Sequence, residues 1–208
     1  MNIPAQIEGK ETNNSAHREF PNVEDAKTHF DLVAARLLNV NEWKNISGPQ
    51  SAGFDVYNSD GQPVERLVQV GDYIRINIPG PGLTTGDGFD WVTVIDIQKS
   101  ASAEEGGDEL ADDVQQVGMT VRPADNPLND SPETAHFFES SATSTFLVMR
   151  TGSKIEASVH GRNEQPNKDV SPKLDKVRNQ LVAATASAMF SGIQWQSLTN
   201  GLVGTGSK

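Results

Sequence analysis

The spacing of apolar residues changes twice along this chain, and no other feature restricts the fold as much. Between residues 22 and 38 apolar side chains recur every three or four positions, which indicates one face of a helix. Between residues 51 and 159 they recur at every second position, which is typical of strands with one buried face. From residue 171 the helical spacing returns. A helix, a run of strands and a closing helix predict an α+β domain, in which an antiparallel sheet of about six strands packs against a long C-terminal helix.

Two helices are predicted ahead of the strands. Asn22 is a suitable N-cap for the first, and the carboxylates of Glu24 and Asp25 in its first turn interact favourably with the helix dipole. A short second helix is predicted over residues 42–46. The Ser-Gly-Pro sequence at residues 47–49 would end it.

The strands are predicted from alternation, which also predicts the side chains that share a face. Ile74 and Ile76 lie on one face of the most regular strand, and Trp91, Ile95 and Ile97 share a face of a later one. The strand candidates are residues 51–56, 64–70, 73–78, 91–97, 117–121, 146–149 and 155–159.

The closing helix has a well-marked start. Ser171 is a suitable N-cap, and Pro172 occupies the first helical position, where proline is favoured. Gly192 is predicted to kink this helix or to divide it in two, because glycine costs about 1 kcal/mol in a helix interior.

The first 21 residues are polar and show no period. They are interpreted as a mobile arm or a weak first strand. The predicted organisation is therefore a flexible N-terminal arm over residues 1–21, followed by a single α+β domain over residues 22–208.

Composition excludes several function classes. The net charge of −11 would repel nucleic acids and anionic membrane surfaces, so neither is expected as a partner. The chain has no cysteine, which excludes disulfides, thiolate catalysis and cysteine-based zinc sites. It shows no secretory signal and no apolar run of about 20 residues, so a cytoplasmic protein is expected.

The densest polar cluster is His160-Gly161-Arg162-Asn163-Glu164, which leaves a predicted strand. As a catalytic site, Glu164 would act as a base, Arg162 would hold a carboxylate, and His160 would be a further acid-base group. As a structural feature, the same residues would form a polar corner that satisfies backbone groups. We favour the second interpretation, because the sequence shows nothing that would perturb a pKa there.

No cofactor and no metal are expected. The glycines between residues 80 and 88 lack the lysine of a phosphate-binding loop and the spacing of a dinucleotide fingerprint. The acidic residues between 104 and 113 lack the ligand spacing of a calcium loop. The four histidines have no partner at a recognised metal spacing.

The order of predicted elements resembles the START-like helix-grip superfamily, which includes polyketide-cyclase-like proteins. The resemblance spans roughly residues 23–203. It rests on the Leu37-Leu38 to Trp43 passage, on the consecutive strands and on the helix after Val159. It implies a curved sheet that grips the C-terminal helix, with an apolar cavity between them in which a hydrophobic small molecule binds.

The first functional hypothesis is therefore a binding protein for a hydrophobic small molecule. Its cavity would lie between the sheet and the last helix, with a mostly apolar lining and a few polar groups. The residues predicted to bind the ligand are Phe54, Arg75, Ile76, Trp91, Met119, Val148, Leu181 and Trp195.

Two alternatives stay open. The same fold could be an enzyme of the polyketide cyclase or hydrolase type, provided that His160, Arg162 and Glu164 converge on one cleft. The protein could also be a structural or interaction module, because the small residues at 183–188 would allow close packing against a second copy. The expected assembly is a monomer or a homodimer, which light scattering would distinguish.

Overall fold

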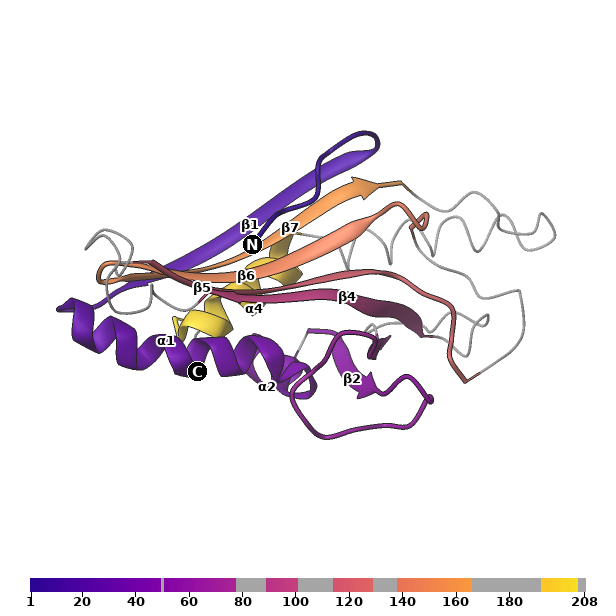
Figure 1. The fold of residues 1–208 in the computed structure, drawn as a ribbon, viewed down its shortest axis with the longest axis horizontal. Coiled ribbons are helices and arrows are strands. Elements are labelled where there is room, and N and C mark those ends of the chain that lie inside the picture. Colours follow the sequence, from indigo (N-terminus) through magenta and orange to yellow (C-terminus); the bar gives the residue numbers. More distant parts are fainter. Residues whose placement is uncertain (50, 78–88, 101–113, 129–137, 166–191, 206–208) are drawn as a thin grey trace.

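A computed structural model of this chain describes residues 1–49, 51–77, 89–100, 114–128, 138–165 and 192–205. Within these residues, seven antiparallel strands form one sheet in the order β1-β7-β6-β5-β4-β3-β2. Figure 1 shows the sheet as a single layer with α1, α2 and α4 on one side of it. The strands are β1 (Lys10–Glu19), β2 (Gly53–Tyr57), β3 (Tyr73–Asn77), β4 (Asp90–Ser100), β5 (Val114–Pro123), β6 (Thr143–Thr151) and β7 (Lys154–Glu164). The helices are α1 (Val23–Leu38), the 3-10 turn η1 (Val40–Glu42), α2 (Trp43–Ser47) and α4 (Gly192–Val203).

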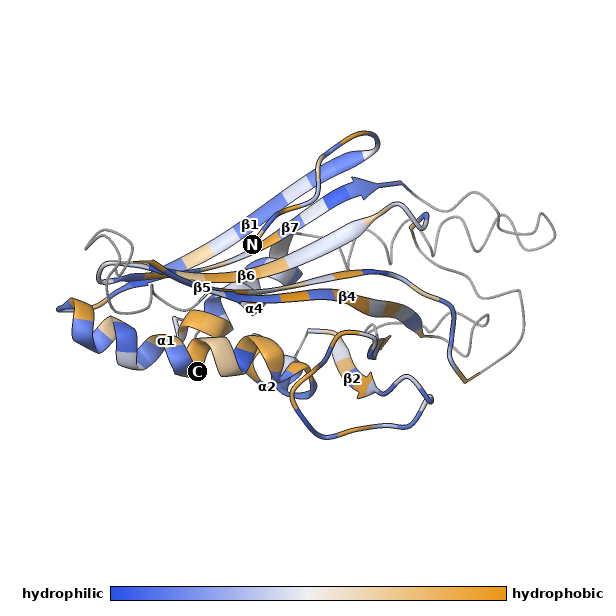
Figure 2. Ribbon diagram, in the orientation of Figure 1, coloured by the Kyte–Doolittle hydropathy of each residue, from blue (hydrophilic) through white to orange (hydrophobic). Residues whose placement is uncertain are grey.

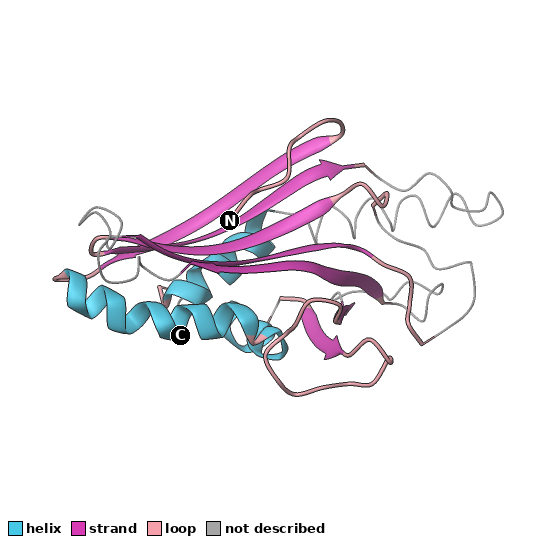
Figure 3. Cartoon of the chain, in the orientation of Figure 1, coloured by secondary structure: helices cyan, strands magenta, loops and turns pink. Residues whose placement is uncertain are grey.

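The predicted fold class is confirmed. Strands that follow one another along the chain are also neighbours in the sheet, except that β1 lies beside β7. Helix α4 packs against β1 and β7, and α1 packs against β5, β6 and β7 (Figure 3). An antiparallel sheet whose described helices lie on one face is an α+β arrangement. The sheet has seven strands, where about six were predicted.

The two faces of the sheet have different roles. We call the face that the helices cover the inner face, and the opposite one the outer face. Phe146, Val148, Ala157 and Val159 lie on the inner face and share a buried cluster with residues of α1 and α4. The register pairs Phe146 with Val159 and Val148 with Ala157. Even-numbered residues of β6 and odd-numbered residues of β7 therefore face inward over this stretch.

Helix α1 begins where the sequence predicts. The Asn22 side chain accepts a hydrogen bond from the backbone N–H of Asp25 at 2.8 Å. Its buried positions, which include Phe30, Val33 and Leu37, lie three and four residues apart. Figure 2 shows hydrophobic and hydrophilic residues alternating along α1, and β1 as mostly hydrophilic. The burial of one stripe therefore holds α1 on the inner face.

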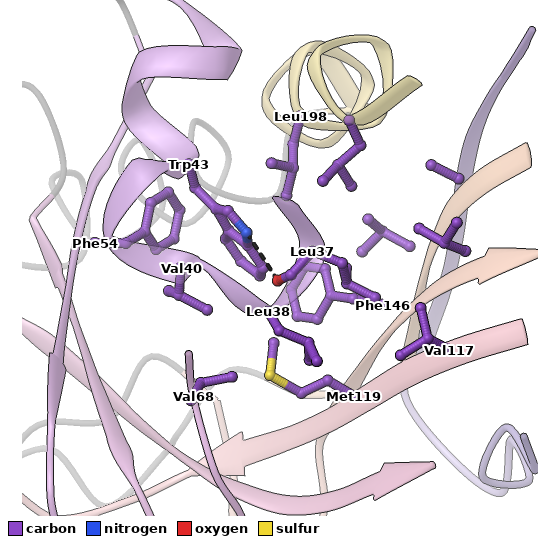
Figure 4. Packing of buried hydrophobic residues seen from close by; sticks show 14 of the residues in the cluster. Leu37, Leu38, Val40, Trp43, Phe54, Val68, Val117, Met119, Phe146 and Leu198 are labelled. Atoms are coloured by element: carbon purple, nitrogen blue, oxygen red, sulfur yellow. Dashed lines mark hydrogen bonds between the residues drawn. The ribbon is translucent and has the colours of Figure 1, made fainter. Parts of the chain in front are cut away.

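Trp43 lies at the centre of the core. Its indole N–H donates to the carbonyl of Leu37 at 3.1 Å, which ties α2 to the last turn of α1. Figure 4 shows Trp43 beside Leu37, with Phe54 and Phe146 from two different strands close to it. The predicted short helix is confirmed, and its tryptophan joins the helices to the sheet.

The N-terminal residues correct one prediction. Residues Lys10–Glu19 form β1, paired with β7 along its whole length, and do not form a flexible arm. Ala16 lies on the inner face opposite Ala157 and is buried with it. Because β1 is an edge strand with one narrow buried stripe, its polar sequence conceals its alternation. Residue 21 therefore does not mark the edge of the folded part.

Two strand predictions also need correction. Residues 64–70 form no strand. Pro63 makes an isolated bridge to Tyr57, and the backbone N–H of Val68 donates to the carbonyl of Leu38. In β4, the register against β5 shifts at Ile95, which is a bulge.

The bulge changes which residues of β4 face inward. Val92 and Val94 face inward before it, and Ile97 faces inward after it. Ile95 is exposed, and Trp91 lies opposite Arg75 on the outer face. The prediction that Trp91, Ile95 and Ile97 share one face is therefore wrong.

The predicted start of the closing helix at Ser171 lies outside the described residues. Helix α4 contributes Trp195, Leu198 and Leu202 to the buried cluster. Gly201 of α4 lies against α2, where an added Cβ would collide with the carbonyl oxygen of Ile46. Glycine therefore permits this close approach of two helices.

We predict that Gly201→Ala lowers the free energy of unfolding by about 1–3 kcal/mol, because the added methyl group overpacks the contact between α4 and α2. Urea denaturation measures this change. Gly53→Ala is the matched control, because its Cβ would meet Asn77 at an ordinary 3.5 Å. Equal stability of the two variants would contradict this packing.

Candidate functional site

An apolar pocket lies between the inner face of the sheet and the helices. Its cavity volume is about 40 Å³. Five aromatic side chains form much of its wall, and the lining also includes the exposed residue Arg122. The lining residues are Trp43, Phe54, Ile74, Ile76, Asp90, Val92, Val121, Arg122, Pro123, Phe138, Ala142, Thr143, Ser144, Phe146, Glu164 and Trp195.

The aromatic wall is held by ring-to-ring contacts between different elements. The Trp43 ring lies 5.2 Å from Phe54 and 4.7 Å from Phe146, measured between centroids. Phe146 in turn meets Trp195 of α4 edge-on at 5.4 Å. Such tilted and edge-to-face pairs contribute about 0.5–1.5 kcal/mol each beyond burial. The wall therefore brings α2, β2, β6 and α4 together around one space.

A bulge in β7 brings a carboxyl group into this pocket. Thr12 of β1 pairs with Gly161, and Lys10 pairs with Glu164, so β7 has one residue more than β1 between these pairs. Asn163 has φ +56°, a left-handed conformation that asparagine tolerates better than most residues. The extra residue reverses the alternation, and Glu164 therefore shares the inner face with Gly161 and Thr12.

Asn163 is anchored by the N-terminal segment. Its side-chain oxygen accepts from the backbone N–H groups of Ile7 and Glu8, at 2.8 and 3.2 Å. Its side-chain amide donates to the carbonyl of Ala5, and its backbone N–H donates to the side chain of Gln6. These four hydrogen bonds compensate for the left-handed backbone, which costs a residue other than glycine about 1–2 kcal/mol.

The carboxyl group of Glu164 is buried, and only one of its two oxygens is hydrogen-bonded among the described residues. The residue is 5% exposed. Oε1 accepts a hydrogen bond from the Thr12 hydroxyl at 3.1 Å, whereas Oε2 has no hydrogen-bond partner among the described residues. Gly161 leaves the space for this group, because a Cβ there would collide with Oε1 and with the Thr12 hydroxyl.

Burial raises the pKa of Glu164 above its ordinary value. The hydrogen bond from Thr12 and the positive charges of Lys10 and Arg162 lower it, but by less. Removal of the carboxylate from water outweighs these interactions, because a charged group loses much of its solvation in an apolar site. Glu164 is therefore an acid that keeps its proton to a higher pH than an exposed glutamate.

His160 and Arg162 do not join Glu164 in the pocket. The His160 ring bonds to the side chains of Asn13 and Ser158, on the outer face. Burial and the charge of Arg162 lower the pKa of His160. Arg162 pairs with Glu11 of β1 at 3.3 Å. Because of the bulge, the three residues lie on two faces of the sheet.

The residues predicted to line the pocket divide into four groups. Phe54, Ile76 and Trp195 line it. Met119 and Val148 fill the buried core elsewhere on the inner face. Leu181 lies outside the described residues.

Arg75 and Trp91 lie on the outer face, because they alternate with the inward-facing residues of β3 and β4. Arg75 pairs with Asp55 at 2.9 Å and lies over the Tyr57 ring. Trp91 packs edge-on against the same ring. Their assignment to the pocket is therefore wrong.

Sequence reasoning missed Trp43 and Ser144 as lining residues. Trp43 lies at the start of a short helix, where only the tertiary fold determines what its ring meets. Ser144 faces inward opposite Gly161 and lines the pocket. The strand alternation of β6, counted back from Phe146, would have indicated this orientation.

The described part of the chain lacks two further features. No group of three or more His, Asp or Glu side chains is placed there to hold a metal ion. No helix among the same residues is both long and apolar enough to cross a membrane.

Comparisons with known proteins give a likeness of fold only. No protein-family model matches the chain, and no curated protein matches it. Among solved structures, a major latex-like protein 151 from Panax ginseng is 16% identical, with 86% of this chain and 97% of that chain covered and a TM-score of 0.33. Ara h 8.0201 is 15% identical, with 92% and 100% covered and a TM-score of 0.33. A truncated norcoclaurine synthase from Thalictrum flavum is 13% identical, with 93% and 96% covered and a TM-score of 0.32. Similarity this low supports no inference about function, and the fold class rests on the strand order described above.

We predict that Asn163→Ala destabilises the protein more than Asn163→Gly, by about 1 kcal/mol. Both variants lose the side-chain hydrogen bonds to residues 5–8, but only alanine is strained at φ +56°. Urea denaturation compares the two. An alanine variant at least as stable as the glycine variant would contradict a left-handed residue 163.

We also predict a pH dependence of stability that Glu164 causes. Because its pKa is raised on folding, the folded state binds this proton more tightly than the unfolded state. The free energy of unfolding contributed by Glu164 is therefore greatest below the ordinary glutamate pKa of about 4 and decreases as the pH rises through the raised pKa. Glu164→Gln should remove this decrease and stabilise the protein at neutral pH, by on the order of 1 kcal/mol.

Chemical denaturation at a series of pH values measures this dependence. Glu156→Gln is the matched control, because it removes a carboxylate from the outer face of the same strand and leaves Glu164 in place. The expectation fails if Glu164→Gln destabilises the protein at neutral pH, or if both variants change the pH profile equally.

Proposed function

We propose that this protein binds a small, mostly hydrophobic molecule in the pocket between the inner face of the sheet and helices α2 and α4. The observation that supports this most is the aromatic wall, in which Trp43, Phe54, Phe146 and Trp195 surround a cavity instead of filling it. Binding pockets are mostly apolar, with a few polar groups that orient the ligand.

The size of the cavity limits the ligand. A volume of about 40 Å³ accommodates about three water molecules. Drug-sized ligands occupy pockets of about 300–1,000 Å³. The cavity therefore accommodates only a small part of such a ligand in this conformation.

An enzyme with His160, Arg162 and Glu164 as its catalytic group receives no support from the geometry. His160 and Arg162 bond to residues of β1 and β7 on the outer face, away from the pocket that Glu164 lines. The interaction-module hypothesis depends on residues 183–188, which lie outside the described residues. Ligand binding is the function that the described geometry supports best.

Toluene is a suitable probe, because it is small and apolar and its ring can contact the aromatic wall. The chain has three tryptophans, and their indole N–H groups are resolvable by NMR. We predict that toluene shifts the indole signals of Trp43 and Trp195, which line the pocket, and leaves that of Trp91 on the outer face unchanged.

Ser144→Leu should abolish these shifts, because its side chain fills the cavity from the inner face of β6. Ser15→Leu adds the same side chain at an exposed position of β1 and should leave the shifts intact. The proposal is wrong if toluene shifts none of the three signals, or if Ser144→Leu leaves the shifts unchanged.

A further inference from the structure

Some polar atoms of the pocket lining have incomplete hydrogen bonding. Among the lining residues, two have a buried oxygen with no partner within the described part of the chain: Glu164 Oε2 and Thr143 Oγ1. Thr143 pairs with Arg162, whose side chain lies on the outer face. Glu164 is therefore the residue that presents an unpaired oxygen on the inner side.

A buried carboxyl oxygen without a partner is unusual, because leaving it unpaired destabilises the folded state, and more so when it is charged. Glu164 is nevertheless positioned by specific features. Gly161 leaves space for it, Thr12 holds Oε1, and the left-handed Asn163 turns the side chain inward. These features leave Oε2 with its hydrogen-bonding capacity free in an apolar pocket.

We propose that Glu164 makes the pocket selective for an amine, an inference that rests on the proposed function. The protonated nitrogen of the ligand would donate to Oε2, and its hydrocarbon part would lie among Phe54, Phe146 and Trp195. A cation is the fitting partner, because it both completes the hydrogen bonding and neutralises a carboxylate that the apolar lining cannot stabilise. A carboxylic acid ligand in its ionised form would instead be repelled.

The two cations near Glu164 weaken its attraction for a cationic ligand but do not occupy its carboxyl group. Lys10 and Arg162 are the cations whose charges act on Glu164, yet neither forms a hydrogen bond with it. Arg162 is engaged by Glu11 and by the carbonyls of Thr12 and Gly161. Glu164 lines a cavity of about 40 Å³, which is large enough for an aminomethyl group.

Three probes with the same ring test this inference: benzylamine, toluene and benzoate. We expect benzylamine to bind the wild-type protein at least tenfold more tightly than toluene, because a charge-assisted hydrogen bond contributes about 1.5–3 kcal/mol. Benzoate should bind more weakly than toluene. NMR titration of the Trp195 indole signal gives all three dissociation constants.

Glu164→Gln should remove the preference for benzylamine over toluene, because glutamine keeps the size of the side chain and loses the charge. Glu156→Gln removes the same charge from the outer face and should keep the preference, which excludes a general effect of the acidic chain. A wild-type-like amide spectrum of each variant confirms that it is folded.

The outcomes separate the two proposals. If toluene binds and benzylamine binds no more tightly, or if Glu164→Gln keeps the preference, amine selectivity is wrong and the binding pocket stands. If neither toluene nor benzylamine perturbs Trp43 or Trp195, the proposed function itself is wrong.

Discussion

The position of a single extra residue in β7 determines what the pocket contains. Without the bulge at Asn163, strict alternation would place Glu164 on the outer face with His160 and Arg162. With it, the last residue of β7 turns inward and lies over Gly161. The N-terminal segment stabilises this geometry, because residues 5–8 satisfy both the side chain and the backbone of Asn163. Residues 5–8, whose sequence shows no regular spacing of apolar residues, thus help to determine which side chain enters the pocket.

The aromatic wall and the buried acid make opposite contributions to stability. The rings of Trp43, Phe146 and Trp195 join helices to strands and stabilise the fold. Glu164 opposes folding once it is ionised, because burial removes its solvation. Stability alone would favour an apolar residue at position 164. A carboxyl group held there by a bulge, a glycine and a threonine is more readily explained by a ligand than by the fold, since functional sites often reduce stability.

Regular periodicity made much of the fold predictable from the sequence. The N-cap at Asn22, the short helix at Trp43 and the inward face of β3 were all evident, because each depends on neighbours along the chain. Features that depend on pairing were not evident. The bulges at Ile95 and Asn163 each reverse a face, and only the register of the adjacent strand locates them. Trp91 and Arg75 were placed in the pocket, and residues 1–21 were assigned to a flexible arm in preference to a weak first strand, because the sequence does not say which strand lies beside which.

The central claim is that the bulge turns Glu164 into the pocket. The most direct test is an NMR titration of the Glu164 side-chain carboxyl carbon, in the wild-type protein and in a variant with one residue inserted between Lys10 and Glu11 of β1. The inserted residue gives Asn163 a partner, so that regular pairing would place Glu164 on the outer face. We expect the wild-type pKa to lie above the ordinary glutamate value and to fall in the insertion variant. A wild-type pKa at or below the ordinary value, or the same pKa in both proteins, would contradict this account.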